Sequence, residues 1–319
     1  MNKGEGLRLY RTLTLIRRAE EAIRLHYGED DMKTPVHLSI GQEAIPVGVC
    51  HVLPEGSPMF GTYRNHALYL ALTEDTDRFF AELHGKEAGM GRGKAGSMHL
   101  CEPSRGLLAT SAVVGTTIPL AVGAALAQAY RHLRQPVAVF FGDGAAEEGV
   151  FWESLNFACQ RSLNLLFVCE DNGLAIHAPA ADRRGFSSIT QAVGGFRCCT
   201  ATADGSDLSA IIEATRALYR DMEADKQPGL LHVSYFRFLE HVGIGEDFFT
   251  GYRQAPSDQE RRERDPLIRF SSHLLSLGYH PAELRAIDVE VDDQICRSIG
   301  RARSADYPTA EALYEDLWV

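Results

Sequence analysis

The chain has 319 residues, of which 45% are apolar and 24% charged, the composition of a globular protein with enough apolar side chains for a full core. Its 43 acidic residues exceed its 32 basic residues, so the net charge is −11. A chain this acidic has no overall field that would attract nucleic acid or an anionic membrane, and we expect neither as a partner. No apolar run reaches the roughly 18 residues of a membrane span.

The seven cysteines are scattered and form no CxxC motif, and the N-terminal stretch has no apolar core of a secretory signal. We therefore expect reduced thiols and a cytoplasmic location.

Hydrophobic patterning predicts an α/β chain with helical ends. Seven segments have features typical of helices: 7–27, 42–52, 119–134, 149–161, 207–224, 265–277 and 281–301. Four apolar runs predict buried strands: 137–141, 165–169, 196–202 and 230–235. The glycine-rich stretch 84–118 has no clear period, which is typical of a functional or mobile segment.

Strands that alternate with helices predict a mostly parallel sheet flanked by helices. We expect a helical N-terminal segment over about 1–35 and a helical C-terminal segment over about 260–319.

The motif Gly142-Asp143-Gly144 lies between the expected strand 137–141 and the expected helix 149–161. Ligands of open parallel sheets bind at the carboxyl ends of the strands, and a helix N-terminus favours phosphate. The two glycines let the backbone approach a ligand closely. A carboxylate between them can bind a divalent metal that also contacts a diphosphate.

Two other phosphate-binding motifs fit this chain poorly. A dinucleotide fingerprint requires Gly or Ala at position 147, where this chain has Glu147. A P-loop requires Gly and Ser or Thr where the nearest candidate has Ala88 and Ala95. An ordinary strand-to-helix turn remains open for the Gly-Asp-Gly motif taken alone.

A second polar turn follows the next expected strand, 165–169. Its Asn172 lies 29 positions after Asp143. One helix and one strand separate the two residues, and a βαβ unit of this kind returns the chain to the same sheet edge. We therefore expect Asp143 and Asn172 to converge as two oxygen ligands, which is a donor set suited to Mg²⁺ on a phosphate.

With both turns in place, the sequence resembles the alpha subunit of thiamine diphosphate-dependent 2-oxo acid dehydrogenases, the decarboxylating component of complexes that act on pyruvate, branched-chain oxo acids or acetoin. The resemblance covers nearly the whole chain in collinear order. The stretches that carry it are 37–44 (HLSIGQEA), 62–66 (TYRNH), 91–99 (GRGKAGSMH), 113–127 (VVGTTIPLAVGAALA), 142–158 (GDGAAEEGVFWESLNFA), 170–176 (EDNGLAI) and 237–241 (RFLEH).

The resemblance implies one thiamine diphosphate-binding domain over 1–319 and assigns its site residues. Mg²⁺ is expected on Asp143, Asn172 and the main-chain oxygen of Leu174. Tyr63 and Arg64 are expected to hold the diphosphate, a task that suits the planar guanidinium. The remaining expected cofactor contacts are Ala112, Val114, Gly142, Gly144, Ala145 and His241. The expected catalytic residues are His37, His66 and His241.

The resemblance also implies the reaction and the partners. The cofactor serves as an electron sink for decarboxylation of a 2-oxo acid, or cleavage of acetoin, and the acyl unit passes to a lipoyl group. The Glu that activates the cofactor is expected on a beta subunit, in an assembly of two alpha and two beta chains. A lipoyl acyltransferase is a further candidate partner.

Several residues depart from the family pattern near the expected site. Glu147 and Glu148 replace the usual Asn-Gln pair, and Asp171 replaces the first Asn of an Asn-Asn pair. Added carboxylates should weaken anion binding unless they face away or pair with cations. His177 and Val242 also differ from the usual residues. Two alternatives therefore stay open: a carboligase that adds the acyl carbanion to an aldehyde or sugar carbonyl, and a non-catalytic subunit that has lost the cofactor.

Overall fold

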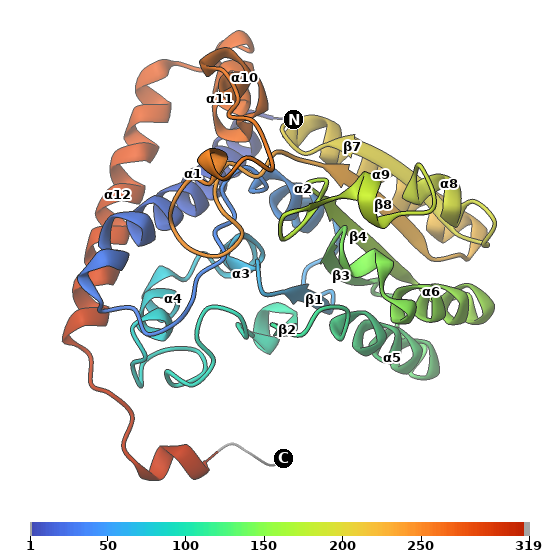
Figure 1. Cartoon of the computed structure of the whole chain (residues 1–319), viewed down its shortest axis with the longest axis horizontal. Coiled ribbons are helices and arrows are strands. Elements are labelled where there is room, and N and C mark those ends of the chain that lie inside the picture. The colour runs from blue at the N-terminus through green and yellow to red at the C-terminus, as the bar shows by residue number, and fades with distance from the viewer. Residues whose placement is uncertain (1, 316–319) are drawn as a thin grey trace.

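The computed structural model describes residues 2–315 and has a six-stranded parallel sheet between two layers of helices (Figure 1). The strand order is β2-β1-β3-β4-β8-β7. The strands of this sheet are β1 (Met59–Thr62), β2 (Leu107–Ser111), β3 (Val137–Gly142), β4 (Leu165–Asp171), β7 (Cys199–Asp204) and β8 (Gly229–Ser234). β5 (Leu174–Ala175) and β6 (Ala178–Pro179) pair as a separate antiparallel hairpin. The expected α/β fold with a mostly parallel sheet is confirmed.

Helices precede, separate and follow the strands. They are α1 (Lys3–His26), α2 (Ala44–Val52), α3 (His66–Thr73), α4 (Thr76–Leu83), α5 (Thr117–Tyr130), α6 (Gly149–Arg161), α7 (Ala180–Arg183), α8 (Ile189–Val193), α9 (Leu208–Asp225), α10 (Asp258–Arg264), α11 (Pro266–Ser276) and α12 (Pro281–Ser304). No helix within residues 2–315 is both long enough and apolar enough to cross a membrane.

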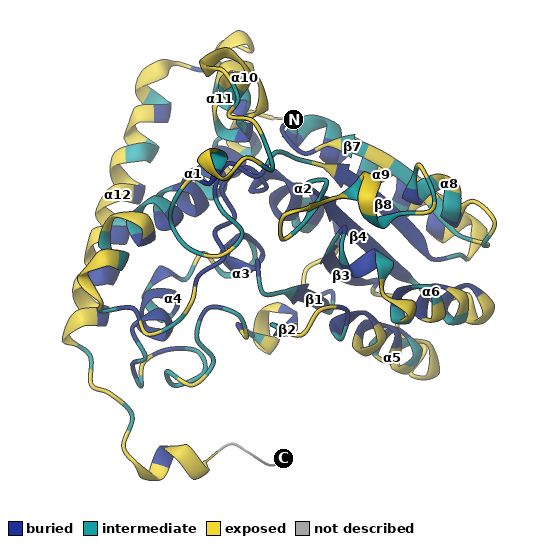
Figure 2. Ribbon diagram, in the orientation of Figure 1, coloured by how far each residue is buried: buried dark blue, intermediate teal, exposed yellow. Residues whose placement is uncertain are grey.

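The central strands are apolar on both faces because both faces are covered (Figure 2). Side chains alternate along β3: Ala138 and Phe140 join the core under α1, α2, α4 and α9, whereas Val137, Val139 and Phe141 join the core under α5 and α6. The side chains of β4 and β8 alternate between the same two cores. Burial on both faces explains why these strands read as continuous apolar runs.

The short strands at one edge of the sheet were missed by the sequence patterning. β1 has four residues and β2 five, and β2 lies inside the stretch 84–118 that has no clear period. The third expected strand was placed too early, since β7 spans Cys199–Asp204 rather than 196–202. Short edge strands carry too few apolar residues for a pattern to emerge.

The C-terminal segment is helical through α10, α11 and α12, and the last four residues of the expected segment, 316–319, lie outside the described residues. α12 packs along α1 and α4 (Figure 1).

A buried ion pair network joins the N-terminal helix to the start of the C-terminal segment. Arg17 Nε donates to Glu43 Oε1 at 2.6 Å, and Arg17 Nη1 donates to Asp265 Oδ2 at 2.8 Å. Glu43 also accepts from the Gly41 amide at 2.7 Å. These contacts fix the loop before α2, and that loop carries Gln42 into the candidate site.

Replacing Arg17 with alanine should lower the free energy of unfolding by about 3–5 kcal/mol, because two carboxylates would remain buried without their cation. The matched control is Arg18→Ala, since Arg18 is half-exposed and its ion pairs are worth at most about 1 kcal/mol. Chemical denaturation measures both variants. Equal losses would mean that the Arg17 network does not stabilise the fold in this way.

Candidate functional site

The candidate site lies where β3, β4 and β8 end side by side. Their parallel register pairs Gly142 with Glu170 and Asp171 with Ser234. The next residues in each chain segment, Asp143, Asn172 and Tyr235, therefore line one cavity of about 230 Å³. As predicted, Asp143 and Asn172 lie at the carboxyl ends of neighbouring strands and line the same cavity.

Most of the predicted cofactor and metal residues line this cavity. They are Tyr63, Arg64, Val114, Gly142, Asp143, Gly144, Ala145, Asn172, Leu174 and His241. Ala112, His37 and His66 are not among the lining residues. Their predicted roles remain predictions.

His37 and His66 lie in different surroundings. The ring of His37 packs 4.5 Å from that of Tyr63 and 5.2 Å from that of His241, measured between ring centroids. His66 is fully buried, with Nδ1 at 3.0 Å from Glu20 Oε1 and Nε2 at 2.6 Å from Ser97 Oγ. His37 thus belongs to the aromatic cluster beside the cavity, whereas His66 anchors the loop that carries Tyr63 and Arg64.

The two cavity-side histidines are held neutral. Burial, and then the nearby Arg64 guanidinium, lower the pKa of His37 to about 3. The same causes in the same order lower the pKa of His241 to about 4. A neutral imidazole can donate one hydrogen bond and accept another without bringing charge into the cavity.

Arg64 connects three segments at the cavity wall. Its Nη1 donates to the carbonyl of Leu38 at 2.7 Å and its Nη2 to the carbonyl of His241 at 2.9 Å. These carbonyls orient a buried guanidinium without neutralising it, so its charge is available to an anion in the cavity.

The donor set at the strand ends suits a hard divalent cation. Asp143 offers a carboxylate that is only 1% exposed, and burial followed by the charge of Asp171 raises its pKa to about 6. Asn172 offers an amide oxygen, which accepts from the Leu174 amide at 3.1 Å, while its Nδ2 donates to Tyr235 Oη at 2.9 Å. Carboxylate, amide and carbonyl oxygens are ligands that Mg²⁺ accepts.

The turn after Asp143 admits no side chain at Gly144. A Cβ there would lie 2.9 Å from the Cβ of Ala175 in the β5–β6 hairpin. Glycine therefore lets the hairpin that carries Leu174 close against the Asp143 turn. The residues present fit a metal-bound diphosphate, because oxygen ligands, glycine backbone and the Arg64 cation share one cavity.

The unusual carboxylates Glu147 and Asp171 are both paired with cations. Arg183 contacts Glu147, and Arg184 Nε donates to Glu147 Oε1 at 3.1 Å. Asp171 Oδ2 lies 3.3 Å from Arg184 Nη1 and 2.9 Å from His232 Nε2. The condition under which added carboxylates are tolerated beside an anion is therefore met for Glu147 and Asp171, whereas Glu148 lines the cavity with its side chain exposed to solvent.

Sequence reasoning gave no role to four polar residues that line the cavity, namely Gln42, Thr62, Glu170 and Tyr235. Glu170 is buried, and burial raises its pKa to about 8, so its carboxyl is mainly protonated at neutral pH. Gln42 Nε2 lies 3.5 Å from Glu170 Oε1. Thr62 and Tyr235 complete the group. Glu170 and Gln42 stand inside the matched stretches 170–176 and 37–44, which was the available signal.

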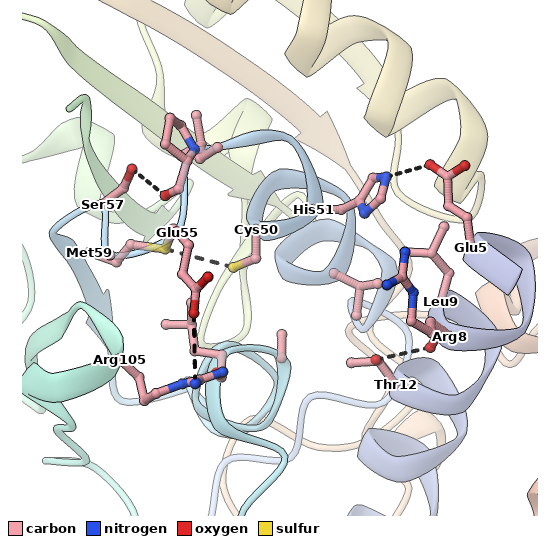
Figure 3. A pocket seen from close by; sticks show the side chains of 16 residues that line it. Glu5, Arg8, Leu9, Thr12, Cys50, His51, Glu55, Ser57, Met59 and Arg105 are labelled. Carbon is pink, nitrogen blue, oxygen red and sulfur yellow. Dashed lines mark hydrogen bonds and ion pairs between the residues drawn. The ribbon is translucent and has the colours of Figure 1, made fainter. Parts of the chain in front are cut away.

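A second, larger cavity of about 370 Å³ lies between α1, α2 and the amino end of β1 (Figure 3). Ser57 and Met59 line it at the amino end of β1. Glu5 and His51 also line it, and Glu5 Oε1 is hydrogen-bonded to His51 Nε2 at 2.8 Å. None of the predicted site residues lines it. The smaller cavity at the carboxyl ends therefore remains the candidate site.

The fold and this cavity define an α/β protein with a polar site at the carboxyl ends of a parallel sheet. The chain belongs to the dehydrogenase E1 component family, which matches residues 11–311. This family uses thiamine diphosphate, and membership supports the dehydrogenase interpretation over the carboligase and the non-catalytic alternatives.

Three relatives illustrate the similarity. The alpha subunit of an acetoin:2,6-dichlorophenolindophenol oxidoreductase from Cupriavidus necator is 33% identical, over 100% of this chain and 96% of that protein. A probable mitochondrial pyruvate dehydrogenase E1 alpha subunit from Caenorhabditis elegans is 32% identical, over 100% and 79%. The pyruvate dehydrogenase E1 alpha subunit of Zymomonas mobilis is 30% identical, over 100% and 90%.

Replacing His37 with glutamine should make the protein less sensitive to acid. In the unfolded chain His37 takes up a proton near its ordinary pKa of 6.5, whereas in the fold it stays neutral down to about pH 3. Stability is therefore lost as pH falls below 6.5, by about 2 kcal/mol at pH 5. Urea denaturation between pH 7.5 and 5 measures the slope. The control variant is His132→Gln at an exposed position; a slope unchanged in His37→Gln would contradict the assignment.

Proposed function

We propose that the cavity at the ends of β3, β4 and β8 binds thiamine diphosphate with Mg²⁺. The observation that carries the proposal is the arrangement of Asp143 and Asn172 at the ends of adjacent strands, on one cavity with Leu174. Asp143, Asn172 and the carbonyl of Leu174 would ligate the cation. The residues that would contact the cofactor are Tyr63, Arg64, Ala112, Val114, Gly142, Gly144, Ala145 and His241.

The bound cofactor would supply an electron sink for cleavage of the bond next to a 2-oxo group. The chain's own part is to bind and orient. The Arg64 guanidinium would pair with diphosphate oxygens, and the free amides at Gly144 and Ala145 would add neutral donors. The neutral imidazoles of His37 and His241 would hold or pass a proton at a ring nitrogen beside the reacting carbon.

His66 is buried beneath the loop of Tyr63 and Arg64 and does not line the cavity. Its two ring nitrogens are already engaged by Glu20 and Ser97. We propose that it supports the reaction by fixing the loop of Tyr63 and Arg64, and its contact with substrate remains a prediction from the family motif.

We propose that a beta subunit covers this cavity and supplies the Glu that activates the cofactor. The supporting observation is an apolar rim: Val113, Val114 and Ile176 are exposed beside the site, and Leu120 is exposed on the adjoining helix α5. Contiguous exposed apolar side chains around a polar site are typical of an interface. The relatives are named as alpha subunits, which supports the same partner.

The wider assembly and reaction follow from that partner. We propose two alpha and two beta chains, with residues 1–319 of this chain forming one cofactor-binding domain. The substrate would be a 2-oxo acid or acetoin, and the acyl unit would pass to a lipoyl group on an acyltransferase. Seven free cysteines support a cytoplasmic location.

Replacing Asp143 with asparagine should weaken thiamine diphosphate binding in the presence of Mg²⁺ by about 100-fold, because loss of a residue that only supports a metal ligand already costs about 10- to 100-fold and Asp143 is a proposed ligand itself. Isothermal titration calorimetry measures the affinity. Glu148→Gln is the matched control, because Glu148 lines the same cavity but is exposed and has no proposed contact with the cation. Equal affinities in Asp143→Asn and the wild type would overturn the metal assignment.

Native mass spectrometry of the chain purified from its host under mild conditions should reveal the partner. We expect a complex with a second chain in a two-plus-two stoichiometry, carrying thiamine diphosphate and Mg²⁺. A homodimer that stays free of cofactor after both are added would contradict the proposal.

A further inference from the structure

Two consecutive arginines reach the metal-site carboxylate from the segment that follows the β5–β6 hairpin. Arg183 Nη2 donates to Asp143 Oδ2 at 2.7 Å, and Arg184 Nη2 donates to the same oxygen at 3.2 Å. Arg183 also donates from Nε to the carbonyl of Ala178 at 2.9 Å. The segment is therefore tied directly to the turn that ends β3.

Three carboxylates and two guanidiniums make up this cluster, which we name the arginine clasp: Asp143, Glu147, Asp171, Arg183 and Arg184. The side chains of Asp143, Arg183 and Arg184 are 1%, 12% and 8% exposed. Charges at such depth are poorly screened by water and salt. The clasp as a whole carries one net negative charge.

The arginines stand in fixed positions because each meets more than one acid. Arg184 contacts Asp143, Glu147 and Asp171 together. Arg183 contacts Asp143 and Glu147. Moving either guanidinium away would leave several carboxylates buried without their partner, which is energetically unfavourable. Its positive charge therefore stays beside Asp143.

This charge affects a divalent cation and a diphosphate in opposite directions. Within the described residues, the hydrogen bonds to the Asp143 carboxylate both go to Oδ2, which leaves Oδ1 for a cation. A cation at Oδ1 would add two positive charges next to two guanidiniums, which is unfavourable on its own. A diphosphate on the same cation brings negative charge that offsets both.

We propose that Arg183 and Arg184 make binding of the divalent cation at Asp143 depend on the diphosphate. The pair disfavours the free cation and favours the cation–diphosphate complex, so the site selects the loaded cofactor. Glu147 and Asp171 hold the arginines in place and thereby serve as positioning residues. The inference rests on the proposed function, since it assigns roles at the same site.

The test is a titration with Mn²⁺, which replaces Mg²⁺ and can be followed by electron paramagnetic resonance. The protein is the assembly as isolated from its host, stripped of metal and cofactor. Wild type, Arg183→Gln and Arg184→Gln are titrated first with Mn²⁺ alone and then in the presence of inorganic pyrophosphate. We expect each variant to bind Mn²⁺ alone about tenfold more tightly than the wild type, because one fixed positive charge is gone.

With pyrophosphate present, the variants should bind Mn²⁺ more weakly than the wild type. Each variant has lost a guanidinium that favours the bound anion. The coupling between Mn²⁺ and pyrophosphate should therefore be smaller in both variants than in the wild type. Arg183→Lys keeps the charge and should restore the wild-type coupling. Arg269→Gln, which removes an arginine of α11 that pairs with Asp204 at the end of β7 and with Asp207, should change neither affinity.

Each outcome decides the proposal. If the variants bind Mn²⁺ alone no more tightly than the wild type while thermal unfolding shows them folded, the arginines only orient Asp143 and the proposal is overturned. A wild type that binds neither Mn²⁺ with pyrophosphate nor thiamine diphosphate would instead refute the proposed function. A wild type that binds thiamine diphosphate with Mg²⁺, together with variants whose coupling between Mn²⁺ and pyrophosphate equals that of the wild type, would overturn the arginine role and leave the proposed function standing.

Discussion

The pairing of β3 with β4 is the constraint on which the site depends. Because Gly142 lies opposite Glu170, the two strands end together, and their next residues enter the same cavity. A slip of one residue would turn Asp143 toward the helices and move Phe141 from one core to the other. The apolar side chains that alternate between the two cores prevent that slip. The same packing that stabilises the sheet therefore places the polar site.

Much of the fold and part of the site could be predicted from local patterns. The apolar runs 137–141 and 165–169 predicted the strands β3 and β4, and the polar turns that follow these runs marked Asp143 and Asn172. The short strands β1 and β2 were not predicted, because four or five residues are too few to show a periodic pattern of apolar side chains. Arg183 and Arg184 escaped for another reason: they act across 40 residues of chain, through a hairpin whose closure on Gly144 has no signature in sequence spacing.

Several titratable groups of the site are neutral, so few of its side chains carry charge. Neutral His37 and His241 and a mainly protonated Glu170 contribute almost no charge at neutral pH, because burial disfavours their ionised forms. The charged residues that line the cavity are Arg64, Asp143 and the exposed Glu148, and Arg183 and Arg184 reach the cavity through their contacts with Asp143. Two of the carboxylates that depart from the family pattern, Glu147 and Asp171, are paired with Arg183 and Arg184, so their effect on an anion depends on these cations as well as on the acids.

The arrangement of polar and apolar residues at the site supports the proposed beta subunit. Its polar residues are suited to holding a metal and a diphosphate, whereas the rim beside them, with Val113, Val114 and Ile176, is apolar and exposed. An apolar rim cannot bind the charged end of a cofactor, but it can be covered by another protein surface. Covering it would exclude water from the cavity and strengthen the charge interactions of Arg64 and Asp143. The proposed beta subunit would therefore strengthen the electrostatic interactions of the site as well as cover its apolar rim.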